Sequence, residues 1–171
     1  HRVGVLGLGG LGHMAVKFAV AFGAEVTVLS TSPNKEQDAL KLGAHKFCVT
    51  KDAEQVKQLT NYFDFIIDTV SAPHNYDMYL KMLRMNGVHI CVGIPPEPIQ
   101  ITGFMLLTNG RSITGSSIGG IPETQEMLDF CAQHNITSDV EVIDISYIND
   151  AYERVIKNDV KYRFVIDMKT L

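Results

Sequence analysis

The stretch that decides the fold runs from Arg2 to Lys35 and reads RVGVLGLGGLGHMAVKFAVAFGAEVTVLSTSPNK. It contains two short apolar runs, Val3 to Leu6 and Val26 to Leu29, which favour buried strands. Between them, apolar residues recur at helical spacing and predict a helix from about Gly10 to Phe22. Its apolar face comprises Leu11, Met14, Ala15, Phe18, Ala19 and Phe22. Strand, helix and strand in this order predict a parallel β-α-β unit.

The same alternation continues to about residue 134. Further strands are expected at Lys46 to Val49, Asp64 to Thr69, Val88 to Val92 and Ser112 to Ile118. Helices are expected from Ser32-Pro33 to Gly43, from Asp52 to Thr60, from Pro73 to Met85 and from Pro122 to His134. Ser32 has the form of an N-cap before a first-turn proline, and Asp52 with Gln55 resembles a capping box. Six strands with crossover helices predict an α/β fold with a doubly wound parallel sheet.

The C-terminal stretch does not continue this rhythm. A strand at Val140 to Ile145, a helix capped near Asn149 and running to Lys157, and a strand at Arg163 to Met168 predict a small α/β appendage. We therefore divide the chain into a nucleotide-binding domain, residues 1–121, and a C-terminal segment, residues 122–171. The chain has no initiator Met and opens directly on a strand, so we expect it to be a fragment of a longer protein.

Composition and charge exclude several classes of protein. The formal net charge is −4 and Lys and Arg do not cluster, so a nucleic-acid partner is not expected. No apolar run reaches the roughly 18 to 20 residues of a membrane span, and no signal peptide is recognised, so we expect a cytoplasmic protein without a membrane partner. The spacing of Cys48, Cys91 and Cys131 fits neither a zinc finger nor a disulfide framework and predicts reduced thiols.

The turn after the first strand carries the main functional signal. Residues Gly7 to Gly12, GLGGLG, match the pattern G-x-G-x-x-G between a strand and a helix. In that context Gly7 makes the tight turn, Gly9 lets the backbone approach a pyrophosphate, and Gly12 permits close packing of helix on strand. The free N–H groups of the helix start would face the phosphates. The alternative is a glycine-rich connection that binds nothing.

The end of the second strand indicates which dinucleotide is bound. An NAD-binding domain has an Asp or Glu there for the ribose hydroxyls, but this chain has Ser30. Glu25 lies at the opposite end of the strand and Glu36 comes after the next helix has begun. An acid would repel a 2′-phosphate by about 4 kcal/mol for unit charges 4 Å apart at an effective dielectric of 20. A small phosphate cradle favouring NADP(H) over NAD(H) is therefore predicted from Ser30, Thr31, Ser32 and Lys35. The alternative is an ordinary turn with an N-cap.

Two stretches carry a resemblance to a known family. Residues Gly7 to Lys17, GLGGLGHMAVK, and Val26 to Lys35, VTVLSTSPNK, resemble the zinc-dependent medium-chain alcohol dehydrogenases of the cinnamyl alcohol dehydrogenase type. The likeness spans nearly the whole chain and continues through Leu42 to Ala44, Asp64 to Ser71, Leu83 to Gly93, Gly115 to Gly119 and Asp159 to Asp167.

The resemblance implies a Rossmann domain of an oxidoreductase, in which a hydride passes between the nicotinamide and a zinc-bound alcohol or aldehyde. It assigns Gly9, Gly10 and Leu11 to the pyrophosphate and Ser30, Thr31, Ser32 and Lys35 to the 2′-phosphate. It assigns Thr69, Val70, Val92, Gly93, Ile94, Ser116 and Ser117 to the nicotinamide side, and Arg163 to the cofactor phosphates. It also implies a homodimer in which Ser112 to Ile118 pairs with its twin.

The family's zinc ligands precede the glycine motif, so this chain lacks them and no metal site is expected in it. The resemblance then implies that the chain binds NADP(H) without dehydrogenase activity, and that residues 122–171 are the returning part of a catalytic domain. Which small alcohol or aldehyde the full-length enzyme would use is not indicated.

Other functional patterns are weaker. Gly115 to Gly119 formally matches the G-x-S-x-G nucleophile elbow, but the following His134 lies too close in sequence and inside a predicted helix. A stand-alone nucleotide-sensing domain or a methyltransferase using S-adenosylmethionine would share the fold, but both normally need an acid where Ser30 stands. His13 lies in the first helical turn, either near the phosphates or as a solvated residue.

Overall fold

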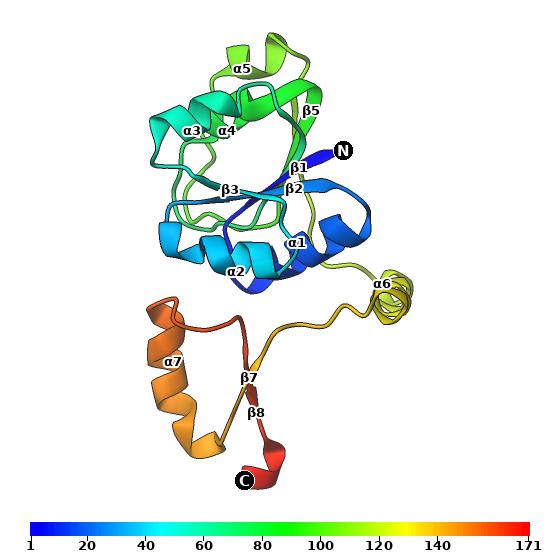
Figure 1. Cartoon of the computed structure of the whole chain (residues 1–171), viewed down its shortest axis with the longest axis vertical. Coiled ribbons are helices and arrows are strands. Elements are labelled where there is room, and N and C mark those ends of the chain that lie inside the picture. Colours follow the sequence, from blue (N-terminus) through cyan, green and yellow to red (C-terminus); the bar gives the residue numbers. More distant parts are fainter.

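A six-stranded parallel sheet forms the centre of the computed structural model, which describes residues 1–171 (Figure 1). Its strands are β1 (Arg2–Leu6), β2 (Glu25–Ser30), β3 (Lys46–Val49), β4 (Phe63–Asp68), β5 (Leu83–Cys91) and β6 (Ser112–Gly115). They lie in the order β3-β2-β1-β4-β5-β6. The order reverses between β1 and β4, so the sheet is doubly wound with its switch point beside β1. The expected α/β Rossmann architecture is confirmed.

Helices cover both faces of this sheet. The helices of the chain are α1 (Gly10–Ala21), α2 (Glu36–Lys41), α3 (Ala53–Gln58), α4 (Tyr76–Met82), α5 (Gly103–Leu107), α6 (Ile121–His134) and α7 (Ile148–Ile156). Figure 1 shows α1 and α2 on one face and α3 and α4 on the other. None of the helices combines the length and the apolar character that a bilayer crossing requires.

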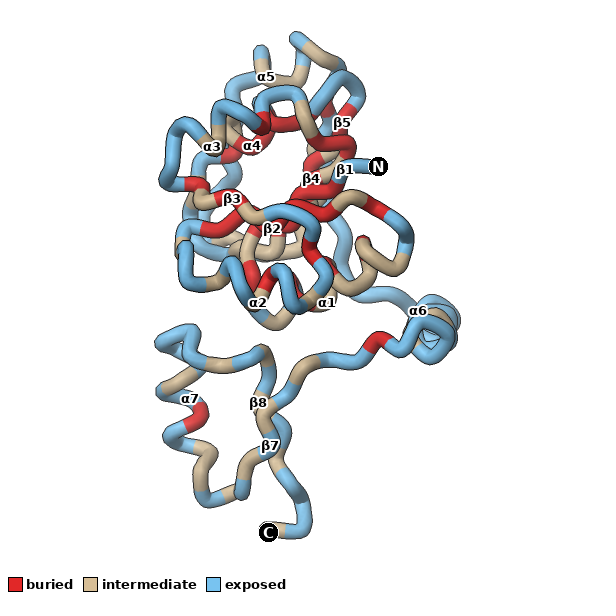
Figure 2. The backbone as a smooth tube through the Cα atoms, viewed as in Figure 1, coloured by how far each residue is buried: buried red, intermediate tan, exposed pale blue.

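Side chains of β1 alternate between two cores. Val3 and Val5 pack into the cluster that includes Val16 of α1, whereas Leu6 packs into the cluster that includes Leu80 of α4. Figure 2 shows the buried residues concentrated along the sheet and the helices beside it. Because both faces are covered, the central strands read as uninterrupted apolar runs.

The C-terminal part has a sheet of its own. Strands β7 (Glu141–Ile143) and β8 (Phe164–Ile166) pair in parallel, with α7 between them in sequence. Figure 1 shows this part apart from the six-stranded sheet, and Figure 2 shows that few of its residues are buried. The division of the chain at residue 121 stays a prediction.

The buried face of α1 differs from the expected one. Leu11 is 54% exposed and Phe22 is 72% exposed, whereas His13 and Val16 are fully buried. The reason is that α1 has a second neighbour besides the sheet. Phe22 stacks on Phe130 of α6 with ring centroids 4.6 Å apart, so part of the apolar stripe faces that helix.

The expected helix from Pro73 to Met85 is wrong at both ends. It begins at Tyr76, because Asn75 is the N-cap and its side chain accepts a hydrogen bond from Met78 N–H. It ends at Met82, because Leu83 already pairs with Phe63 of β4 as the first residue of β5.

Other boundaries also differ. Ser32 stands at an N-cap position but makes no side-chain cap, and Pro33–Lys35 form a 3₁₀ turn before α2. Asp52 caps α3, but the Gln55 side chain binds Asp52 Oδ2 and Val49 N–H, so no reciprocal capping box forms. α3 ends at Gln58, β6 ends at Gly115, and α7 starts at Ile148 after a 3₁₀ turn capped by Asp144 rather than near Asn149. Helix α5 was not expected from the sequence.

Candidate functional site

The glycine turn lies where β1 meets α1, at the carboxyl edge of the sheet. Gly7 has φ of +89°, a left-handed conformation that favours glycine. A Cβ on Gly12 would overlap the carbonyl oxygen of Gly7 and lie 3.0 Å from its carbonyl carbon. By contrast, no atom lies within 4 Å of the position that a Cβ on Gly9 would take. The turn is therefore tight where helix meets strand and open where a ligand would approach.

A cavity of about 590 Å³ lies beside this turn. Leu8, Gly9 and Gly10 line it on one side, and residues of α7 and β8 line the other. Lys35 and Arg163 both contribute to its wall, and Arg163 Nη2 is 3.7 Å from the position of a Cβ on Gly10. A third cation on the wall, Lys161, is paired with Asp38. The cavity thus combines the start of a helix with the cations Lys35 and Arg163, which suits a phosphate group.

Lys35 connects the loop after β2 to the glycine turn. Its Nζ donates a hydrogen bond to the carbonyl oxygen of Leu8 at 3.0 Å. Burial lowers the pKa of its amine, against a smaller opposing effect of Asp38. The amine therefore has a fixed position and a partly desolvated charge, and an anion in the cavity would offset that desolvation.

The hydroxyl residues of the loop lie in different environments. Ser30 is the last residue of β2 and is buried, and its Oγ accepts a hydrogen bond from Ser32 N–H at 3.2 Å. Thr31 is exposed and Ser32 is half-buried. The Ser30 O–H keeps its hydrogen free to donate, so the loop retains donors beside Lys35.

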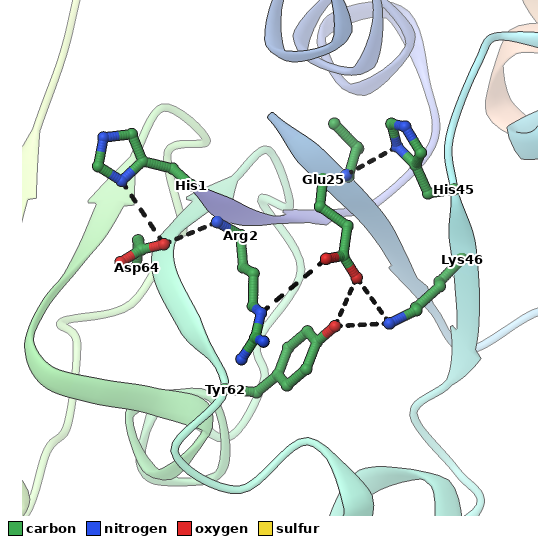
Figure 3. A network of polar contacts seen from close by, with 8 residues as sticks. His1, Arg2, Glu25, His45, Lys46, Tyr62 and Asp64 are labelled. Atoms are coloured by element: carbon green, nitrogen blue, oxygen red, sulfur yellow. Dashed lines mark hydrogen bonds and ion pairs between the residues drawn. The ribbon is translucent and has the colours of Figure 1, made fainter. Parts of the chain in front are cut away.

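No unpaired carboxylate stands at the carboxyl end of β2. Glu25 is the first residue of that strand, and its Oε1 accepts hydrogen bonds from Lys46 Nζ and Tyr62 O–H, both at 2.6 Å (Figure 3). Glu36 opens α2 and is exposed. Asp38, which no sequence pattern marked as a site residue, lines the cavity but forms an ion pair with Lys161 at 2.8 Å.

The loops after β4 and β5 lie side by side at the same edge. A Cβ on Gly7 would lie 2.8 Å from Val70 Cγ2 and 3.0 Å from Thr69 Oγ1. A Cβ on Gly93 would lie 2.6 Å from the carbonyl oxygen of Val70. Val92 and Gly93 N–H both donate to the carbonyl oxygen of Asp68. These contacts bring four of the predicted nicotinamide-side residues next to the glycine turn: Thr69, Val70, Val92 and Gly93.

The remaining predicted residues of this side are more exposed. Ile94 N–H donates to Ser71 Oγ at 3.3 Å, and the Ile94 side chain projects into solvent. Ser116 N–H donates to the carbonyl oxygen of Cys91 at 3.0 Å, which fixes it beside the end of β5. Ser116 and Ser117 are both exposed. His134 packs on Phe130 within α6, with ring centroids 4.2 Å apart.

A buried cluster centred on Asp68 holds the loop after β4 in place. Its Oδ2 accepts hydrogen bonds from His74 Nε2 at 2.9 Å and His89 Nε2 at 3.1 Å, and its Oδ1 accepts one from Val70 N–H at 3.0 Å. Burial opposes ionisation of Asp68, but these hydrogen bonds outweigh it and lower its pKa to about 2. Burial would lower the pKa of His74, but its bond to Asp68 raises it.

Sequence reasoning missed this cluster because its members come from two strands and a loop. Cys91 also lies close, with its Sγ, an Asp68 oxygen and a His89 nitrogen all within 4.8 Å of one another. The available signals were Asp68 directly before Thr69 and the alternation of His89 with Cys91, which places both on one face of β5.

His13 is not a solvated residue. It is fully buried, and its ring stacks on Tyr162 with centroids 4.6 Å apart. Neither residue was expected to pair with the other, since 149 positions separate them in the chain.

The residues present fit a bound dinucleotide. The open face of Gly9, Arg163 and the start of α1 suit a pyrophosphate, and Lys35 suits a further phosphate beside the loop after β2. The glycine turn continues without a break into the Thr69 and Val92 loops. One half of such a ligand would follow β2 and the other would follow β4 and β5, as binding at a switch point requires.

Comparison with known proteins decides the family, because the profile of the zinc-binding dehydrogenases matches residues 10–133. The chain belongs to the zinc-binding dehydrogenase family. It is 56% identical over 168 residues to mannitol dehydrogenase of Petroselinum crispum, covering 98% of this chain and 50% of that protein. This zinc-binding dehydrogenase chain therefore spans about half the length of the curated relatives it matches.

Solved structures of similar proteins share the fold. A cinnamyl alcohol dehydrogenase from Sorghum bicolor superposes with a TM-score of 0.94 at 48% identity, covering 97% of this chain and 47% of that chain. CAD from Helicobacter pylori, complexed with NADP(H), superposes with a TM-score of 0.86 at 44% identity, covering 98% of this chain and 48% of that chain. The resemblance drawn from the glycine turn and the loop after β2 is thus confirmed.

Proposed function

We propose that this chain binds NADP(H) across the carboxyl edge of its six-stranded sheet. The observation that carries the proposal is the glycine turn, with an open face at Gly9 and the cations Lys35 and Arg163 at the adjoining cavity. In the proposed complex the pyrophosphate lies at the start of α1, where free backbone N–H groups and the positive end of the helix face it.

The loop after β2 is proposed to hold the 2′-phosphate of the adenosine ribose. Lys35 supplies the charge, and the hydroxyls of Ser30, Thr31 and Ser32 supply donors. The preference over NAD(H) comes from the missing acid at Ser30, because a carboxylate there would repel the phosphate by several kcal/mol, about 4 at an effective dielectric of 20. The complex of the Helicobacter pylori relative with NADP(H) supports this choice.

At the other end, the nicotinamide would accept or donate a hydride. Thr69 and Val70 would border it on one side, and Val92, Gly93 and Ile94 on the other. Ser116 and Ser117 would offer backbone groups to it. The Asp68 cluster holds Val70 N–H directly and so fixes the position of the loop that carries two of these residues.

For the whole protein we propose an NADP(H)-dependent alcohol dehydrogenase or aldehyde reductase that acts on a small alcohol or aldehyde. The names of the Petroselinum and Sorghum relatives support this reaction class. The resemblance places the zinc ligands of such enzymes ahead of the glycine motif. We therefore expect this chain alone to bind cofactor without turning over substrate.

The test is a calorimetric titration of the purified chain with NADPH and with NADH. We expect NADPH to bind at least roughly tenfold more tightly, as one charge-assisted hydrogen bond from Lys35 would provide. Equal affinity would refute the 2′-phosphate site, and no binding of either would refute the cofactor site. Zinc-dependent oxidation of an alcohol by this chain alone would refute the expected inactivity.

We also propose a homodimer through residues 112–118. β6 is an edge strand of the sheet, so its outer backbone groups are free to pair with a second copy. Light scattering should then give twice the chain mass. Ser116 N–H donates to β5, so by alternation the N–H of Gly115 faces the outer edge, and a proline in place of Gly115 should give monomers. A monomeric wild-type chain would contradict the proposal. The cytoplasmic location stays a prediction.

A further inference from the structure

His13 joins the glycine turn to the C-terminal part of the chain. Its Nδ1 lies 3.1 Å from the carbonyl oxygen of Gly9, and its Nε2 accepts a hydrogen bond from Asp139 N–H at 3.3 Å. Its ring stacks on that of Tyr162, with 14° between the planes. The buried imidazole of His13 therefore contacts the glycine turn and two separate residues of the C-terminal segment, Asp139 and Tyr162.

Arg163 directly follows Tyr162 in the chain. Both residues reach Gly10: the Tyr162 carbonyl oxygen and Arg163 Nη2 each lie 3.7 Å from the position of a Cβ there. We call the contacts of His13 with Gly9, Asp139 and Tyr162 the His13 joint. Two ion pairs flank it, Lys17 with Asp139 at 2.6 Å and Lys161 with Asp38 at 2.8 Å. The flanking pairs are at least partly exposed, so they contribute little orientation by themselves. The stack of His13 on the half-buried Tyr162, together with the hydrogen bond from Tyr162 N–H to Asp139 O at 3.0 Å, holds the backbone of the exposed Arg163 beside the turn.

We propose that His13, in its neutral form and together with Tyr162, positions Arg163 at the glycine turn, so that dinucleotide affinity falls when His13 is protonated. His13 and Tyr162 are positioning residues in this scheme, and Arg163 is the residue that would contact the phosphates. The inference rests on the proposed cofactor site and adds a pH dependence to it.

The hydrogen bonds require one tautomer. Nε2 accepts from Asp139 N–H, so it carries no hydrogen, and Nδ1–H donates to Gly9 O. Protonation would place a second N–H against that of Asp139, and two donors cannot bond each other. The ring would then leave the joint or force the segment of Asp139 away, and Arg163 would lose its fixed position.

The surroundings of the ring favour its neutral form. Burial lowers the pKa of His13, backbone hydrogen bonds to Gly9 and Gly10 oppose this, Lys17 lowers the pKa further and Asp139 raises it. Tyr162, the remaining titratable group that faces the ring, has a pKa raised to about 12 by burial and does not titrate with it. The joint is therefore intact at neutral pH and is lost as the pH falls through the lowered pKa of His13.

The first test is a calorimetric titration with NADP⁺ between about pH 5 and pH 8. The wild type is compared with His13→Leu, which keeps an apolar side chain but cannot titrate, and with His134→Leu as the matched histidine control. At the upper pH we expect His13→Leu to bind roughly fivefold more weakly, the value of one net hydrogen bond. The difference should vanish at the lower pH. The 2′-phosphate itself ionises at about pH 6, but this effect is the same for both proteins and cancels in the ratio of their affinities for NADP⁺.

The second test needs no cofactor. Amide hydrogen exchange of residues 137–143 should be faster in His13→Leu and in Tyr162→Ala than in the wild type. Exchange in the wild type, corrected for intrinsic rates, should rise as the pH falls. If wild-type affinity does not change relative to His13→Leu across the pH range, or if exchange is unaffected, the proposal is wrong. If the wild type binds no dinucleotide at any pH while exchange behaves as expected, the cofactor site fails and the His13 joint stands.

Discussion

Gly12→Ala and Gly9→Ala are expected to separate folding from binding, although each adds one methyl group to the same turn. At Gly12 the methyl would overlap Gly7 O and lie 3.2 Å from Thr69 Oγ1. Backbone cannot yield as a side chain can, so α1 must move away from the turn. Such overpacking costs up to about 3 kcal/mol, of which the better helix propensity of Ala returns about 1 kcal/mol. The net loss of unfolding free energy should be about 2 kcal/mol, or roughly 4 to 8 °C in Tm.

At Gly9 the methyl would meet no protein atom within 4 Å, and φ of −138° is accessible to alanine. The loss of a favourable N-cap residue and the smaller entropy of the unfolded chain roughly cancel, so stability should change by less than about 0.5 kcal/mol. The methyl does occupy the space proposed for the pyrophosphate. We therefore expect the Kd for NADPH to rise roughly tenfold or more, as when a charge-assisted hydrogen bond is lost.

Urea unfolding followed by circular dichroism measures the first effect, and calorimetric titration with NADPH measures the second. Gly103→Ala is the control, because no atom lies within 4 Å of a Cβ there either and α5 lies outside the site. A Gly12→Ala protein as stable as the wild type would show that the turn is not tight. A Gly9→Ala protein with unchanged affinity would show that no phosphate approaches there.

Three further changes test other parts of the structure. Lys35→Met should weaken NADPH binding roughly tenfold or more with little effect on NADH, measured by the same titration. Asp68 has a pKa of about 2 in the folded state, so its contribution of about 2 kcal/mol is complete above its unfolded pKa of about 3.9 and is lost as the pH falls through about 2. The stability gap between the wild type and Asp68→Asn in urea should narrow accordingly in acid. Arg111→Met should lower the unfolding free energy by roughly 1 to 3 kcal/mol, because the buried guanidinium donates to Leu83 O at 2.9 Å and Met105 O at 3.1 Å.

Each of these has a clear contrary result. Lys41→Met, at an exposed lysine at the end of α2, should leave both affinities unchanged, so an equal effect there would mean that Lys35 acts only through net charge. A stability gap at Asp68 that is independent of pH would mean that the pKa of this aspartate is the same in the folded and the unfolded protein, so that its hydrogen bonds do not lower it. An Arg111→Met protein with unchanged thermal unfolding would mean that water replaces the lost donors.

The sheet and its order of elements were predictable because both faces of the central strands are covered. Val26 to Leu29 and Val3 to Leu6 read as plain apolar runs, and the glycine turn between the first strand and helix is local in sequence. The loop after β2 could also be recognised from the sequence, since Ser30 and Lys35 are only five residues apart.

The sequence did not predict the features that depend on contact with a segment distant in the chain. Leu11 and Phe22 continue the apolar pattern of α1, yet α6 and solvent, not the sheet, face them. His13 is polar and fully buried because Tyr162 covers it, and no local pattern reports a partner so far away in the chain. The Asp68 cluster likewise depends on the register of β4 with β5, which apolar periodicity does not specify.

The position of β1 in the sheet has a consequence for synthesis. β1 lies between β2 and β4, so its pairing is complete only when Asp68 has left the ribosome, 62 residues after Leu6. At roughly 5 to 20 residues per second this interval is about 3 to 12 s. During that time one edge of β1 is free to pair with other nascent chains. A chaperone that covers apolar segments would therefore be most useful before β4 has emerged.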